Sequence, residues 1–397
     1  VLGPGLLAGL SDDDPAGIGT YAVLGAEHGY GLLWIIPLST VLLIWFHLLA
    51  VRIGAATGLG FVANLRVRWG HRAGWLAAAG LLFANFGTIC AEYAGIASAA
   101  ELAGIPAWFS APAAAVLISV VVVLGSFHRV EGVLLVISST LALYLVDGLL
   151  AGPDWGQVLQ GSLIPRLPVT EAGWVVLTAT LGTTLAPWGL AFIQSYAVDK
   201  RLTKEDLKLL RVDVWTGSLL TGIIGFFVVI TCAATLNGSG QTNITDAAQA
   251  AVALKPLAGT LAKELFAVGL IGAALLAASI LPLSTAYAVT DLTGRPAALD
   301  DKANEAPLFY ATFGAITILA ATLVLIPGSQ LIKILVLTQI LNAVLLLPLL
   351  LYMFGIARDG RLMGEYKASG RMLMVYALII AIIFICVGTL LWFSFAG

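Results

Sequence analysis

The sequence has few charged residues, few histidines and few cysteines. Charged side chains make up 11% of its 397 residues, against about 25% in a soluble domain, and the mean hydropathy is +0.99. This composition excludes an ordinary soluble domain and is typical of a polytopic membrane protein. The three cysteines lie in apolar runs and the four histidines are scattered. The sequence therefore predicts neither a disulfide framework nor a Cys/His metal centre.

Other function classes are also disfavoured. The formal net charge of −2 gives no indication of nucleic-acid binding. The chain has no His-Glu-x-x-His zinc motif, no Gly-x-Gly-Asp motif and no Ser/His pairing typical of an intramembrane enzyme. We expect a protein that is not an enzyme, has no cofactor and has the lipid bilayer as a partner.

Apolar runs long enough to cross a bilayer recur along the whole chain. A spanning helix needs about 20 apolar residues. This criterion predicts eleven spans, at 1–27, 31–56, 74–102, 106–127, 131–152, 172–198, 214–236, 257–290, 307–327, 331–356 and 372–395. No linker separates a second domain, so we expect one transmembrane domain over 1–397, functional as a monomer. The charged stretch at 199–213 predicts a short helix on one membrane face.

The loops between these runs differ in their content of lysine and arginine. With the N-terminus in the cytoplasm, 16 of the 20 Lys and Arg residues fall in inner loops and 4 in outer loops. Positive residues favour the cytoplasmic side of a membrane. We therefore expect a plasma-membrane protein with a cytoplasmic N-terminus and an extracytoplasmic C-terminus.

The first predicted span is interrupted by the sequence SDDDPAGIG. A charged residue at the bilayer centre costs about 2.5–3.5 kcal/mol on insertion scales. Asp12, Asp13 and Asp14 must therefore face a water-filled cavity or a cation if they lie within the span. Pro15 disfavours helical conformation at the residue before it, so we predict that the helix breaks here. The alternative is that the span begins only at Ile18 and the aspartates lie at the membrane surface.

The sixth predicted span carries a second interruption, with Gly182, Pro187 and Gly189 in mid-span. Proline kinks are common in membrane helices, so this feature alone is weak. Its position five spans after the first break is more informative. Interrupted helices at matching positions of two halves point to a transport site at the bilayer midplane.

The chain is therefore interpreted as an all-α integral membrane protein built from inverted repeats. Five spans occupy 1–152, five more occupy 172–356, and the helix at 372–395 is an eleventh, additional span. Because each repeat contains an odd number of spans, the second copy has the opposite orientation in the membrane. Helices 1 and 6 are the broken helices of this 5+5 arrangement.

At these breaks the sequence resembles the Nramp family of divalent-metal transporters, which has the fold of the bacterial leucine transporter (LeuT). The family's Asp-Pro-Gly-Asn and Met-Pro-His motifs correspond to Asp-Pro-Ala-Gly at 14–17 and Ala-Pro-Trp at 186–188. The segment CAEYAG places Glu92, and LTQILNAVLLLP places Gln339. The resemblance implies a LeuT-type fold with a metal site between the two breaks.

Several family positions carry different residues here. The family's asparagine ligand corresponds to Gly17, its methionine ligand to Ala186, and its first proton-transfer histidine to Trp188. Two further polar positions of the family correspond to Ile89 and Ile193. This pattern is similar to the Nramp-related magnesium transporters, a branch of the family.

The residues at the two breaks define the expected metal site. Carboxylate, carbonyl and water oxygens suit Mg²⁺ and Mn²⁺, whereas thioether and imidazole suit transition metals. The expected metal-site residues are Ser11, Asp14, Gly17, Thr183, Ala186 and Gln339. Residues expected along the path or around the site are Asp12, Asp13, Glu92, Trp188 and Asn342.

These residues predict transport of divalent cations, Mg²⁺ and also Mn²⁺, by alternating access. Mg²⁺ dehydrates reluctantly, so we expect a partly hydrated ion and, without histidines in span 6, no coupling to protons. One alternative is a proton-coupled Mn²⁺/Fe²⁺ transporter. Another is a cation-coupled carrier of an organic solute with the same fold, which the three aspartates disfavour because they would repel a substrate carboxylate. An ion channel is disfavoured, because it would need a symmetric pore or filter ring, which an inverted-repeat monomer does not suggest.

Overall fold

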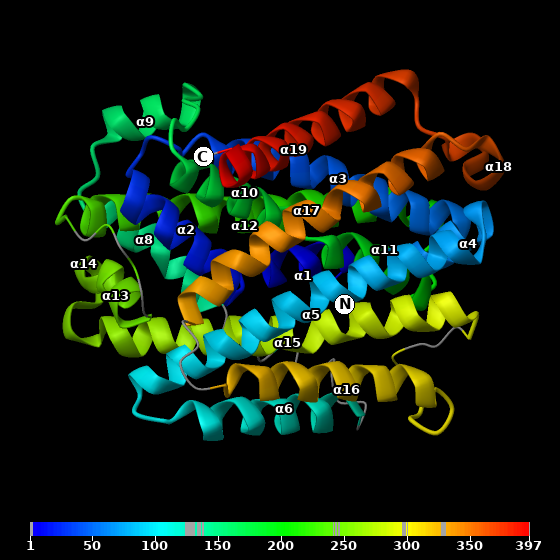
Figure 1. Ribbon diagram of the computed structural model, residues 1–397, viewed down its shortest axis with the longest axis horizontal. Helices are drawn as coiled ribbons and strands as arrows, with labels where there is room; N and C mark the ends of the chain where they lie inside the picture. Colours follow the sequence, from blue (N-terminus) through cyan, green and yellow to red (C-terminus); the bar gives the residue numbers. More distant parts are fainter. Residues whose placement is uncertain are drawn as a thin grey trace.

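The computed structural model describes residues 3–123, 132, 136, 139–240, 242, 244, 247–295, 299, 301–326 and 331–396. These residues form helices and no strand (Figure 1). The first half of the chain contains α1 (Pro4–Ser11), α2 (Pro15–His28), α3 (Ile35–Thr57), α4 (Phe61–Trp69), α5 (His71–Leu102), α6 (Ala107–Val123), α8 (Leu143–Leu150) and α9 (Trp155–Leu163). The second half contains α10 (Glu171–Thr184), α11 (Pro187–Asp199), α12 (Leu207–Cys232), α13 (Ala247–Ala251), α14 (Lys255–Ala258), α15 (Ala262–Thr293), α16 (Pro307–Val324), α17 (Leu331–Ala357), α18 (Gly360–Met363) and α19 (Gly370–Ala396).

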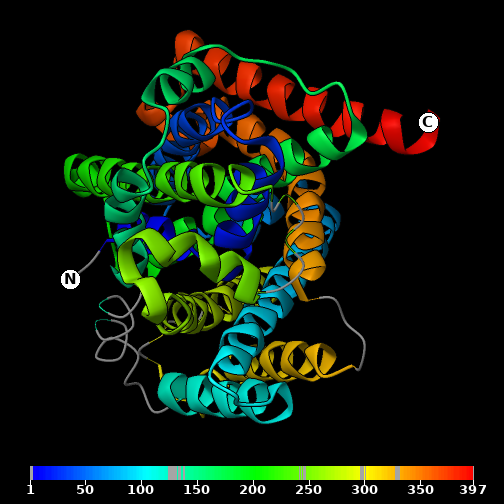
Figure 2. The ribbon, with the colours of Figure 1, turned by 90° about the vertical axis from the view of Figure 1, so that its left-hand side faces the viewer.

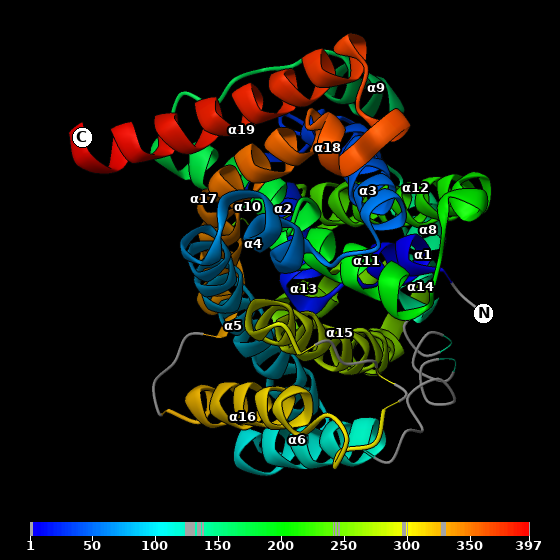
Figure 3. The same cartoon turned by 90° about the vertical axis from the view of Figure 1, so that its right-hand side faces the viewer.

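The short helices of both breaks lie at the centre of the molecule. On one side α6 and α16 form an outer layer against α5 and α15, as Figures 2 and 3 show. On the opposite side α19 packs against α10 and α17. The central helices α1, α2, α10 and α11 are thus shielded by longer helices.

Both predicted breaks are present, and local chemistry explains each. Pro15 occupies the first turn of α2, where its missing N–H leaves no bond unmade. Asp14 caps that helix, since its Oδ1 accepts a hydrogen bond from the Gly17 N–H at 2.6 Å. At the second break α10 ends at Thr184 and Pro187 begins α11, with Ala186 between them in extended conformation.

Eight stretches of the described residues are long and apolar enough to cross a membrane. They correspond to the predicted spans 2, 3 and 6 to 11. The other three predicted spans correspond to the broken pair α1–α2, to α6 and to the region of α8. Parts of the predicted spans 106–127 and 131–152 lie outside the described residues.

The charged stretch at 199–213 is not a separate surface helix, so this prediction was wrong. Lys204–Asp206 forms one 3₁₀ turn, and from Leu207 onward the chain already belongs to α12. Charge marks where a segment leaves the apolar layer, whereas a helix ends only where its backbone hydrogen bonds end. The first turns of α12 therefore carry the charges of this stretch.

Helix α12 runs alongside both halves of the first broken helix in the same direction. Small residues on α12 allow the close approach, as expected between helices in a membrane. The contacts pair, in order, Gly9 with Gly217, Asp13 with Thr221, and Tyr21 with Gly225. One unbroken helix therefore contacts α1, the break and α2.

Asp213 of α12 stabilises the start of α1. Its carboxylate accepts hydrogen bonds from the backbone N–H groups of Gly5 at 2.6 Å and Leu6 at 3.1 Å.

Hydrogen bonds to a charged group contribute about 1.5–3 kcal/mol. We expect Asp213→Ala to lower the free energy of unfolding by about that amount, measured by thermal unfolding in detergent. Glu205→Ala, at an exposed position of the same segment, is the control, and equal stability of the two variants would contradict this role of Asp213.

Candidate metal site

Oxygen atoms of three residues, from the first break and from α10, converge beside Gly17. An ideal Cβ placed on Gly17 would lie 2.6 Å from the Asp12 carbonyl oxygen and 3.3 Å from Asp14 Oδ1. The same point lies 3.4 Å from the hydroxyl oxygen of Thr183, in the last turn of α10. A side chain such as the asparagine expected here from the family would need the Asp12 carbonyl to shift. Carbonyl, carboxylate and hydroxyl oxygens are the ligands that hard divalent cations prefer.

Glu92 of α5 lies beside Asp14. Helices α2 and α5 approach closely here, because Gly95 of α5 has no side chain and the Pro15 ring of α2 packs against it. The Glu92 and Asp14 carboxyl groups interact electrostatically. The two side chains are within hydrogen-bonding reach of each other. Two neighbouring buried carboxylates repel each other when both are charged, so a cation or a proton between them would be stabilising.

The other residues of the first break are also buried. Asp12 and Asp13 are each 3% exposed and Ser11 is 1% exposed. The aspartates are therefore enclosed by the protein, and helices both before and after them contradict a span that begins only at Ile18. Asp13 Oδ1 accepts a hydrogen bond from Thr221 at 2.7 Å. Asp12 Oδ2, Asp13 Oδ2 and Ser11 Oγ have no hydrogen-bond partner among the described residues.

Gln339 lies next to the site, but its side chain is engaged elsewhere. Its backbone carbonyl packs against Gly182 of α10. Its Oε1 accepts a hydrogen bond from Asn342 Nδ2 at 2.9 Å. Asn342 Nδ2 also donates a hydrogen bond to the hydroxyl oxygen of Thr88 at 2.9 Å. Gln339 and Asn342 thus form a hydrogen-bond network with α5. The amide oxygen of Gln339 would need to break its hydrogen bond with Asn342 to reach a cation.

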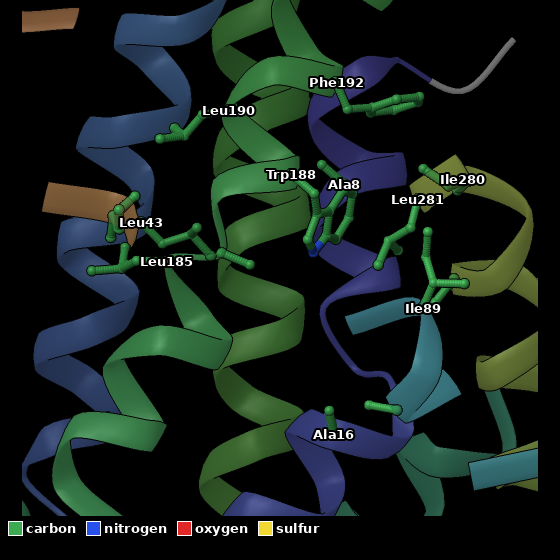
Figure 4. Packing of buried hydrophobic residues seen from close by; sticks show 14 of the residues in the cluster. Ala8, Ala16, Leu43, Ile89, Leu185, Trp188, Leu190, Phe192, Ile280 and Leu281 are labelled. Carbon is green, nitrogen blue, oxygen red and sulfur yellow. The ribbon is translucent and has the colours of Figure 1, made fainter. Parts of the chain in front are cut away.

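Ala186 and Trp188 make the second break apolar. Ala186 is the residue before α11, and its small side chain is 5% exposed. The Trp188 ring is buried in the hydrophobic core and points from α11 toward Ala8 and Leu281 (Figure 4). Its carbonyl accepts a hydrogen bond from Ser284 at 3.1 Å. The Trp188 ring is thus packed among apolar side chains, and its carbonyl is engaged by Ser284.

A row of polar residues on α5 was missed in the sequence. Asn85 and Thr88 precede Glu92 by seven and four residues, so the three side chains share one helix face. Asn85 Nδ2 donates to Thr285 of α15 at 3.0 Å. The spacing was visible in the sequence, whereas the partners on α15 and α17 were not.

The described residues contain no group of three His, Cys, Asp or Glu side chains that could hold a metal ion. A cation near Gly17 would therefore depend on carbonyl and hydroxyl oxygens as well as on Asp14. The arrangement can bind a cation that accepts such neutral ligands and retains some of its waters.

Comparison with solved structures agrees with the predicted fold. A manganese transporter of Eremococcus coleocola, solved with an aromatic bis-isothiourea compound, superposes with a TM-score of 0.79 at 19% identity, covering 99% of this chain and 85% of that chain. Mhp1, a nucleobase-cation-symport-1 family transporter, gives a TM-score of 0.58 at 16% identity, covering 98% and 90% of the two chains. The LeuT-type fold, with broken helices 1 and 6, is confirmed.

Comparison with known sequences gives the family. The divalent metal cation transporter MntH of Erwinia tasmaniensis is 26% identical over 395 residues, covering 94% of this chain and 91% of that protein. MntH of Aeromonas hydrophila is 26% identical over 397 residues, covering 96% and 93%. The model of the natural resistance-associated macrophage protein-like family, Nramp, matches residues 5–393. Since this match spans nearly the whole chain, the protein belongs to the Nramp family.

Proposed function

We propose that this protein transports divalent metal cations across the plasma membrane, chiefly Mg²⁺ and also Mn²⁺, as partly hydrated ions. The relatives named above are divalent metal cation transporters and a manganese transporter. The observation that carries the proposal is the set of oxygens around Gly17, which come from Asp12, Asp14 and Thr183. We further propose that the protein works as a monomer with its N-terminus in the cytoplasm.

The ligand chemistry supports Mg²⁺ over softer ions. The oxygens beside Gly17 are hard donors, which suit Mg²⁺ and Mn²⁺. The position at which the family has a methionine ligand carries Ala186, whose methyl side chain offers no ligand atom to a soft ion. A site that leaves several waters on the ion suits Mg²⁺, because this ion dehydrates reluctantly.

We propose that transport is not coupled to protons. Trp188, Ile193 and Ile89 cannot transfer protons, and all three are fully packed in the core. The membrane potential alone supplies a driving force, since each charge moved is worth about 2.3 kcal/mol per 100 mV. For a divalent cation this amounts to about 4.6 kcal/mol per 100 mV.

Uptake into liposomes with an internal pH indicator tests this function. We expect Mg²⁺ and Mn²⁺ to enter when the interior is negative, while the internal pH does not change with metal uptake. Metal-free liposomes with the same protein control for proton leak. Acidification at the rate of metal entry would reject uncoupled transport, and failure to move either ion would reject the proposed function.

The variant Ala186→Met tests the ligand chemistry in the same assay. A thioether at this position would favour softer ions, so we expect Cd²⁺ uptake to increase relative to Mg²⁺ uptake. Ala186→Leu fills a similar volume without sulfur and is the matched control. Equal effects of the two variants would show that volume, and not ligand type, sets selectivity at this position.

A second candidate is proton-coupled transport of Mn²⁺ or Fe²⁺. The pairing of Glu92 with Asp14 favours it, because two neighbouring carboxyl groups can exchange a proton for a cation. Comparison of the unmodified protein with Glu92→Gln discriminates the candidates. A coupled transporter would acidify the interior during metal uptake, and Glu92→Gln would abolish this acidification. An uncoupled transporter would leave internal pH constant with either protein.

A further inference from the structure

A cavity of about 590 Å³ opens between α3, α12 and the segment that leads into α19. It is separate from the metal site, and its lining combines basic, aromatic and aliphatic side chains. The residues that line it are Trp45, Leu48, Val51, Arg52, Leu207, Arg211, Trp215, Glu365, Tyr366 and Met372. Such a combination fits neither a metal ion nor a purely apolar ligand.

Two guanidinium groups line this cavity, and only one of them is held by hydrogen bonds. Arg52 is held in place, since its Nε donates to the Tyr366 carbonyl at 2.7 Å and its Nη2 donates to the Lys367 carbonyl at 3.3 Å. Arg211 is exposed on α12 and takes part in no ion pair or hydrogen bond with the described residues. A guanidinium carries five N–H donors in a planar fork that matches phosphate, so both groups retain donors for an anion.

The local charge is positive in spite of one acidic side chain. Glu365 lines the cavity and offsets one of the two arginines. The ammonium group of Lys204 lies 4.9 Å from the centre of the Tyr366 ring, and Lys208 lies one turn before Arg211 on α12. The loops at this end also belong to the lysine- and arginine-rich side identified in the sequence.

An unpartnered hydroxyl group lies behind the cavity. The Tyr376 ring meets Trp45 edge-on, with ring centres 6.2 Å apart. Tyr376 is 3% exposed, lies within electrostatic reach of Arg52, and its hydroxyl has no hydrogen-bond partner in the described structure. This hydroxyl adds a polar group behind the two arginines.

The position of the cavity identifies the kind of ligand. Trp215 is 49% exposed on the outer surface of α12, and tryptophan is enriched where a membrane meets water. The aliphatic residues Leu48, Val51 and Leu207 line the same cavity, beside the spanning part of α3. Basic pockets between membrane helices on the cytoplasmic side bind anionic lipid head groups.

We propose that this cavity binds one anionic phospholipid, with its phosphate between Arg52 and Arg211 and an acyl chain along α3 and α12. The lipid would fasten the start of α12 to α3 and to the segment before α19. The proposal does not depend on which ion the protein transports.

Native mass spectrometry of the detergent-solubilised protein, titrated with phosphatidylglycerol or phosphatidylcholine, tests the site. We expect one phosphatidylglycerol to bind more tightly than phosphatidylcholine, and Arg211→Gln to weaken its binding about tenfold through loss of charged hydrogen bonds. Lys208→Gln removes the same charge one turn away, outside the cavity, and is expected to change binding by less than about twofold.

The variants are chosen so that folding does not confuse the result. Arg211 and Lys208 are both exposed, whereas Arg52 supports the backbone before α19 and is left unchanged. Equal weakening by Arg211→Gln and Lys208→Gln would show diffuse attraction by a basic surface and overturn the proposal. Equal binding of phosphatidylcholine and phosphatidylglycerol would overturn it as well.

Discussion

Asp14→Asn is expected to abolish metal uptake while leaving the protein folded. Asparagine is as good a helix cap as aspartate, so it can still accept the hydrogen bond that Asp14 Oδ1 receives from Gly17. It removes the negative charge beside the oxygens that surround Gly17. Because mutations of residues that merely support metal ligands already cost about 10–100-fold, we expect at least about a 100-fold loss of Mg²⁺ uptake.

Asp14→Ala separates the two roles of this residue. It removes the charge and also the cap of α2, and loss of a cap costs about 1 kcal/mol of stability. We therefore expect equal loss of uptake in both variants, but a lower melting temperature only in Asp14→Ala. Uptake by Asp14→Asn at the rate of the unmodified protein would refute the assignment of Asp14 as the anionic ligand.

Gly182→Ala is expected to impair both folding and transport. A Cβ on this residue would overlap the Gln339 carbonyl oxygen and lie 3.0 Å from the Ala343 backbone nitrogen. Backbone atoms cannot rotate away, so α10 and α17 would have to separate. Overpacking of this kind costs about 1–3 kcal/mol, and it would displace the neighbouring Thr183. We expect about a tenfold loss of Mg²⁺ uptake, given how strongly small misplacements affect function.

Gly314→Ala is the matched control for Gly182→Ala. Gly314 lies in α16, and a Cβ there meets no atom within 4 Å. Alanine in a helix interior is intrinsically better than glycine by about 1 kcal/mol. We therefore expect this variant to be at least as stable as the unmodified protein and fully active. Similar behaviour of the two variants in thermal unfolding and uptake would show that the α10–α17 contact is not as close as described.

The breaks were predictable from the sequence because their causes are local. Pro15 and Pro187 lack an N–H and disfavour helical conformation at the preceding residue, and the aspartates before Pro15 exclude a helix that faces lipid. Similar reasoning predicted that Glu92 is functional, since a carboxyl group inside a membrane span is energetically costly and is retained mainly at functional sites. Its pairing with Asp14 was not predicted, because it depends on how α5 meets the first break in space.

What the sequence could not provide are contacts between distant residues. Asp213 lies in a charged stretch that predicted a surface helix, yet its carboxylate caps α1, more than two hundred residues earlier. Gln339 was expected to offer its amide to the ion, but Asn342 engages that oxygen in the structure. Both outcomes depend on how helices meet in space, which neither spacing nor hydropathy specifies.

The position of α12 beside the first broken helix limits how this protein can move. Bending α1 against α2 would disrupt both the Asp13–Thr221 hydrogen bond and the tight glycine contact of α1 with Gly217. Movement of α5 relative to α2, where Glu92 lies beside Asp14, would leave both of those contacts in place. Opening along that boundary would change the spacing of the two acidic groups, so the affinity for a cation would differ between the two states. Unequal affinity is the thermodynamic condition for an ion to shift a conformational equilibrium.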